Sequence, residues 1–84
     1  MQANRTIQDY LRDQRMLRQK IILQRLQRGV AEGDLSKRVN LNVIASFYST
    51  VMNGLAIQAR DGATRKDLKS MVDCAMGAWD RLVE

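Results

Sequence analysis

The side chains that most often carry out catalysis or hold metal ions are scarce in this chain. Its 84 residues include no histidine and a single cysteine, Cys74, so the usual metal-ligand sets and nucleophile–base pairs are missing. Asp9 and Asp13 form a carboxylate pair four residues apart, but arginines surround them, and solvated ion pairs on a helix explain that pattern. We therefore expect no enzyme, no metal site and no cofactor, and a structural role for Cys74.

The composition predicts one small helical domain over residues 1–84. The chain has no proline, and 45% of its residues are hydrophobic, which favours a folded chain over a disordered one. No apolar run approaches the roughly 20 residues that a membrane-spanning helix needs, and the charged start does not resemble a secretory signal. We expect a cytoplasmic protein without a membrane partner.

The net charge of +5 lies entirely in the first part of the chain. Residues 1–39 hold nine basic and four acidic residues, whereas residues 40–84 hold five of each. A basic segment can bind nucleic acid or anionic membranes. Two alternatives stay open on this ground: a small basic three-helix module that binds nucleic acid, and an amphipathic helix over residues 5–31 that binds a partner or a membrane surface. The arginines are spread around that helix, which favours a solvated face.

Apolar spacing and helix signals predict an all-α fold. Asn4 or Thr6 can cap the start of the first helix, Gly33 can end it, and Asn40 can cap the second helix. The expected helices cover about 5–32, 41–61 and 65–83.

The corner between the second and third helices is the best specified stretch. Gly62 follows Asp61 where a left-handed residue can close a helix. Thr64 can then cap the next helix, and Asp67 stands three residues later, as in a capping box. So short a turn predicts that the two helices form an antiparallel hairpin.

The predicted helices carry more apolar surface than 84 residues can cover. On the first helix, Ile7, Tyr10, Leu11 and Leu17 have no evident partner within the chain. The hairpin likewise presents a broad apolar face, and two-fold association into a four-helix bundle across a homodimer is the simplest way to bury it. The expected dimer-interface residues are Phe47, Tyr48, Val51, Leu55, Leu68, Val72, Ala75 and Trp79.

The stretch from Gly54 to Leu68 also resembles a known family. It matches the pattern G-L-x-x-Q-A-R-D-G-A-x-x-x-x-L, with which the ligand-binding and dimerisation domain of many TetR-family transcriptional regulators ends. Residues 30–35 resemble the helix-ending segment before the family's penultimate helix. The resemblance covers roughly residues 17–83 and implies the same homodimeric bundle.

The resemblance implies transcription regulation, typically as a repressor. We expect the chain to be the dimerisation and effector-binding region of a TetR-like, DNA-binding regulator. The family's helix-turn-helix is expected to precede this region and to lie outside these 84 residues, so operator DNA is reached only through it. A small-molecule effector is the other expected partner. Because tyrosine offers a polar handle and methionine adapts to irregular ligands, the candidate ligand-binding residues are Tyr10, Met16, Tyr48 and Met52.

Overall fold

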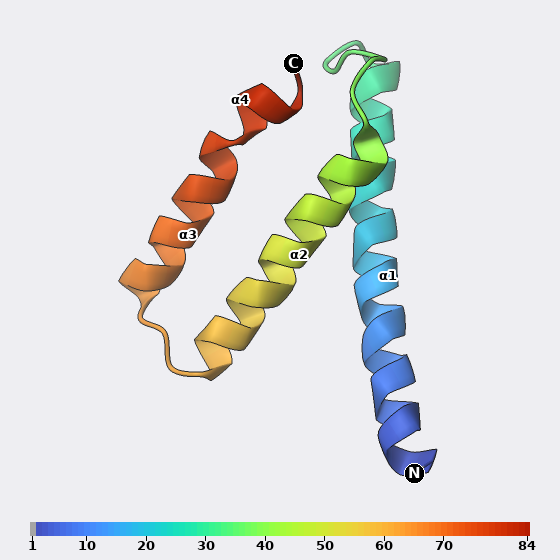
Figure 1. The fold of residues 1–84 in the computed structure, drawn as a ribbon. Coiled ribbons are helices and arrows are strands. Elements are labelled where there is room, and N and C mark those ends of the chain that lie inside the picture. Colours follow the sequence, from blue (N-terminus) through green and yellow to red (C-terminus); the bar gives the residue numbers. More distant parts are fainter. Residues whose placement is uncertain (1) are drawn as a thin grey trace.

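The fold is all-helical in the described part of the chain. The structure, a computed structural model, describes residues 2–84, with side chains from residue 6 onward. Three long helices follow one another and a single helical turn ends the chain (Figure 1). The helices are α1 (Gln2–Ala31), α2 (Leu41–Arg60), α3 (Arg65–Gly77) and α4 (Trp79–Leu82). The all-α fold with three main helices is confirmed.

The three long helices lie side by side in one layer, with α2 in the middle (Figure 1). The molecule measures 46 × 33 × 15 Å, and its radius of gyration is 15.2 Å. A compact chain of this length would have a radius of about 12 Å. The short dimension is close to the diameter of one helix with its side chains, about 10–12 Å. Both faces of the layer are therefore open to solvent over much of the molecule.

The helix ends follow the sequence signals closely. Gly33 and Gly62 take positive φ angles of 86° and 98°, and each closes its helix with a Schellman pair of hydrogen bonds. The Asn40 side chain accepts a hydrogen bond from the Val43 N–H, which caps α2. At the start of α3, Thr64 and Asp67 form the full capping box. The predicted hairpin corner is confirmed.

The predicted start of the first helix is wrong. Asn4 and Thr6 lie inside α1, which already begins at Gln2. Gln2 and Ala3 are good helix formers, so nothing in the sequence forces the helix to begin later.

The third helix is shorter than the predicted 65–83, because α3 ends at Gly77 and the chain turns at Ala78 into α4. Glycine is unfavourable inside a helix by about 1 kcal/mol relative to alanine. A Cβ added at Gly77 would meet nothing within 4 Å, so no close contact in the chain requires a glycine at this position. The break instead frees Trp79, Leu82 and Val83 to pack in the core.

The core lies at one end of the layer, where the end of α1, the start of α2 and α4 meet. Leu26, Ile44 and Ala45 form its buried centre. Gly29 contributes by being small, since a Cβ there would stand 3.1 Å from the Leu35 side chain that covers it. The residues packed around the centre are Ile22, Leu23, Leu35, Val39, Leu41, Tyr48, Trp79, Leu82 and Val83.

Candidate interaction surface

An apolar groove of about 520 Å³ runs between α2 and α3 on one face of the layer. Phe47, Val51 and Leu55 line it from α2 at intervals of four residues, so their side chains stack along one side of that helix. The groove also includes Gly54, Gln58, Ser70, Met71, Cys74 and Ala75. In the described structure no helix covers this groove, because α1 packs on another side of α2 (Figure 1). We call it the hairpin groove.

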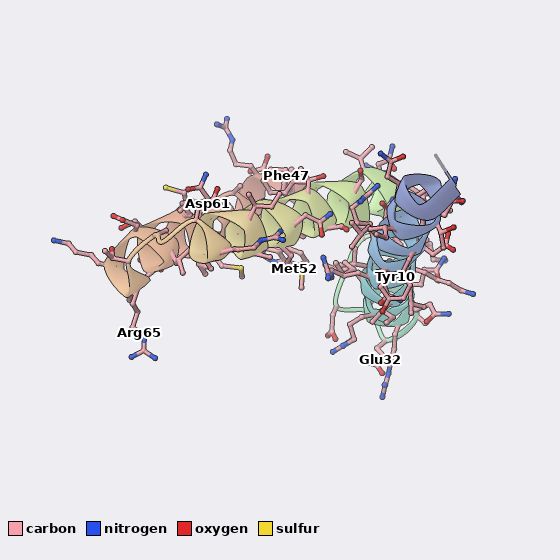
Figure 2. All side chains as sticks on the ribbon, turned by 90° about the horizontal axis from the view of Figure 1, so that it is seen from below. Tyr10, Glu32, Phe47, Met52, Asp61 and Arg65 are labelled. Atoms are coloured by element: carbon pink, nitrogen blue, oxygen red, sulfur yellow. The ribbon has the colours of Figure 1, made fainter. Side chains whose placement is uncertain are left out.

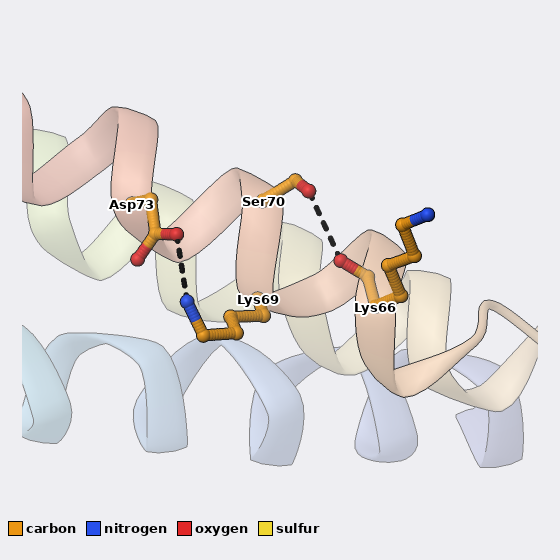
Figure 3. A network of polar contacts seen from close by, with 4 residues as sticks. All are labelled: Lys66, Lys69, Ser70 and Asp73. Atoms are coloured by element: carbon orange, nitrogen blue, oxygen red, sulfur yellow. Dashed lines mark hydrogen bonds and ion pairs between the residues drawn. The ribbon is translucent and has the colours of Figure 1, made fainter.

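Ser70 in the hairpin groove and the neighbouring charged residues of α3 make their polar contacts within that helix. Ser70 Oγ donates a hydrogen bond to the carbonyl oxygen of Lys66, 3.1 Å away within α3 (Figure 3). Lys69 forms an exposed ion pair with Asp73, with 3.0 Å between Nζ and Oδ2 (Figure 3). Because most of the residues that line the groove are apolar, it offers mainly apolar surface to a partner.

Four of the eight predicted interface residues line the hairpin groove: Phe47, Val51, Leu55 and Ala75. Leu68 is half-buried, and Val72 is 40% exposed. Gly54, Met71 and Cys74 also line the groove, although the sequence reasoning did not select them. Gly54 stands three residues after Val51, Met71 four residues before Ala75, and Cys74 three residues after Met71, and this helical spacing is the signal that could have found them.

Tyr48 and Trp79 are engaged within the chain. The Tyr48 hydroxyl donates a hydrogen bond to the Ala75 carbonyl oxygen at 2.9 Å and so joins α2 to α3. Burial raises the pKa of this hydroxyl above its usual value, because desolvation disfavours the charged form. The Trp79 ring lies 6.0 Å from the Tyr48 ring and packs against the core. A substitution at Trp79 would therefore disturb the fold as well as any interface.

The candidate ligand-binding residues do not converge on one cavity. Tyr48 and Met52 lie one turn apart on α2, and Met52 is 46% exposed. Tyr10 and Met16 are both 62% exposed on α1, where six residues turn the helix by roughly 240°, so they point in different directions. Figure 2 shows Met52 and Phe47 on opposite sides of the α2–α3 layer. Met52 therefore belongs to the face opposite the hairpin groove.

A shallow groove between α1 and α2 gathers positive charge that the sequence did not place together. Arg15 and Arg18 line it from α1, and Arg60 lines it from α2 beside Leu11 and Ile57. The Arg18 guanidinium also donates to the side-chain oxygen of Asn53, which ties the middle of α1 to α2.

Two further observations concern the described residues as a whole. No three of their histidine, cysteine or acidic side chains are grouped to hold a metal ion. None of the described helices has an apolar stretch long enough to cross a membrane.

Comparison of the chain with models of protein families, with curated proteins and with solved structures gives no match.

Proposed function

We propose that this chain is the dimerisation and effector-binding region of a TetR-like transcriptional regulator. The observation that carries the proposal is the hairpin groove, an apolar surface left uncovered by the rest of the described chain. The segment of residues 54–68, which resembles the family's terminal motif, forms the corner of the hairpin that bears this groove.

In the proposed dimer, the hairpin of a second copy packs against the hairpin groove about a two-fold axis. Phe47 and Met71 bury their side chains against the other copy, and Gly54, which lines the groove without a side chain, leaves room for a helix of that copy to approach. Two hairpins joined in this way form a four-helix bundle. The apolar area removed from water drives the association.

The regulatory role follows from coupling the dimer to a small molecule. A ligand that binds one arrangement of the helices more tightly than another shifts the balance between them, and operator affinity changes with it. In the proposal, operator contact belongs to a helix-turn-helix of the regulator and the helices described here supply the dimer. Tyr48 and Met52, one turn apart on α2, are the best placed of the four candidates to contact an effector together.

A charge placed in the hairpin groove tests the dimer on which this function depends. Phe47→Glu puts a carboxylate into the proposed interface, whereas Met52→Glu puts the same charge on the opposite face as a matched control (Figure 2). Phe47 is 37% exposed and Met52 46% exposed, so neither change buries a charge in the monomer. In sedimentation equilibrium, Phe47→Glu should weaken self-association at least tenfold, and Met52→Glu should leave it unchanged.

Cys74 supplies a readout specific to this groove. It is the only cysteine of the chain, it is exposed, and it lines the groove. Its rate of reaction with a thiol reagent should fall as the protein concentration rises, and Phe47→Glu should abolish that protection. Equal reactivity at all concentrations in the unaltered chain would contradict the proposed dimer.

A further inference from the structure

A second uncovered apolar stripe runs along the outer side of α1. Its members are Ile7, Tyr10, Leu17 and Ile21, which are 59%, 62%, 51% and 57% exposed. They lie roughly 120° around the helix from Ile22 and Leu26, which face the core, and Gln14, which continues their row, also lines the edge of the α1–α2 groove. We call these four residues together with Gln14 the outer stripe.

The spacing of the outer stripe is that of a coiled-coil seam. Its positions 7, 10, 14, 17 and 21 alternate steps of three and four residues, which is the a and d pattern of a heptad repeat. Such a seam packs along one other helix in knobs-into-holes fashion. It is narrower than the face of a helix that packs into a globular core.

The exposed area of the chain is large enough for two interfaces. The chain exposes 6884 Å², about 1,800 Å² more than the roughly 5,100 Å² that surface scaling gives for a compact monomer of 9.6 kDa. A standard interface buries only about 800 Å² on each partner. Covering the hairpin groove would therefore leave about half of this excess uncovered.

We propose that the outer stripe of α1 is a second self-association surface, which pairs antiparallel with the outer stripe of another copy. The charges beside the stripe favour this orientation. Asp13 and Lys20 both flank it at the g position of the heptad. With a two-fold axis between positions 14 and 17, Asp13 of each copy meets Lys20 of the other, which gives two attractive pairs.

A parallel pair is less favourable. It would place Lys20 of one copy beside Arg25 of the other, and these two positive charges repel each other. Its attractive contact would join Asp13 to Arg18, whose guanidinium already binds Asn53 of its own chain.

This second surface does not depend on the proposed function. The outer stripe lies on α1 and the hairpin groove lies between α2 and α3, so one can be disrupted while the other stays intact. A chain that uses both surfaces assembles beyond a dimer, because each isologous contact adds a separate two-fold axis.

Two neighbouring substitutions test the surface in the full chain. Leu17→Glu places a charge in the outer stripe, and Met16→Glu places the same charge one residue away, off the stripe, at a similarly exposed position. Both are made in the Phe47→Glu chain, where α1 pairing is the association under test. Sedimentation equilibrium should show a dimer for Phe47→Glu alone and with Met16→Glu, and a monomer with Leu17→Glu. A monomeric Phe47→Glu chain, or equal masses for the two double variants, would overturn the proposal.

Charge reversal tests the antiparallel orientation in the same background. Lys20→Asp and Asp13→Lys should each weaken association at least tenfold, because each sets like charges against one another. An equimolar mixture of the two variants should recover it, since every pair is then attractive. A parallel pair predicts instead that Lys20→Asp strengthens association, and that result, or no change, would overturn the antiparallel arrangement.

Discussion

At the scale of single residues, Tyr48 is the side chain that ties α3 to α2. Its hydroxyl reaches the Ala75 carbonyl oxygen, and its ring lies beside Trp79 and 4.9 Å from Phe47. The hydroxyl thus satisfies a backbone acceptor near the point where α3 ends. Tyr48 therefore contacts both Phe47, which lines the hairpin groove, and Trp79, which packs against the core.

Tyr48→Phe should lower the free energy of unfolding by about 1 kcal/mol, because the substitution leaves the Ala75 carbonyl without its side-chain donor. The difference should also depend on pH. The folded-state pKa is raised above the usual tyrosine value of 10.0, so the unfolded chain loses this proton first. Stability from this group is complete below about pH 10 and declines as the pH rises toward the folded-state pKa.

Urea unfolding of the unaltered chain and of Tyr48→Phe between pH 8 and pH 11 measures how their stability difference depends on pH. Tyr48→Phe should be less stable at pH 8 and should lack the part of the alkaline decline that Tyr48 causes. Parallel curves for the two proteins across this range would show that the hydroxyl does not titrate in the expected way.

The cap of α3 is also a contribution of single residues. Thr64→Ala removes the side chain that accepts from the Asp67 N–H at 3.1 Å and should cost about 1 kcal/mol of stability. Thr50→Ala is a suitable control, because the Thr50 hydroxyl only returns to the Ser46 carbonyl within α2. Thermal unfolding followed by circular dichroism should show a lower midpoint for Thr64→Ala only.

At the scale of elements, two glycines at helix ends have opposite roles. Gly62 needs its left-handed conformation, so Gly62→Ala should lose roughly 1–2 kcal/mol and loosen the hairpin corner. Gly77 lies in open space without a positive φ, so Gly77→Ala should gain up to about 1 kcal/mol by extending α3. Urea unfolding should show a lower free energy of unfolding for Gly62→Ala and a higher one for Gly77→Ala. A lower value for both variants would mean that the packing of α4 requires the break at Ala78.

The element boundaries that the sequence predicted are those with a local cause. Gly33, Gly62 and the Thr64–Asp67 box act within one turn of the chain, and the structure places all three as expected. The break after Gly77 was missed because its cause is distant: Trp79 packs against the core formed by Leu26, Ile44 and Ala45, far away in the sequence. Four of the eight predicted interface residues line the hairpin groove, and the others could not be placed for a similar reason. Helical spacing selected Phe47 and Val51, but only the packing of α3 shows which neighbours complete the groove.

At the scale of the whole molecule, a layer one helix thick cannot bury a large core by itself. Only Leu26, Ile44, Ala45 and Ala75 are buried hydrophobic residues in the described chain. A chain of this size is marginal alone, so its stability should depend on association. The thermal midpoint should rise with protein concentration between 1 and 100 μM. The rise should be smaller in Phe47→Glu, and a midpoint independent of concentration in the unaltered chain would argue for a stable monomer.

The placement of α4 has a consequence for cooperativity. Trp79 closes a contact between the end of the chain and α1, so the first and last helices share one small core although α2 separates them in the layer. Without that contact, α3 could melt while α1 and α2 stayed paired. The chain has a single tryptophan, so its fluorescence reports the surroundings of Trp79 in the core, whereas circular dichroism reports all helices. If the contact makes the three helices one folding unit, both signals will follow the same unfolding curve.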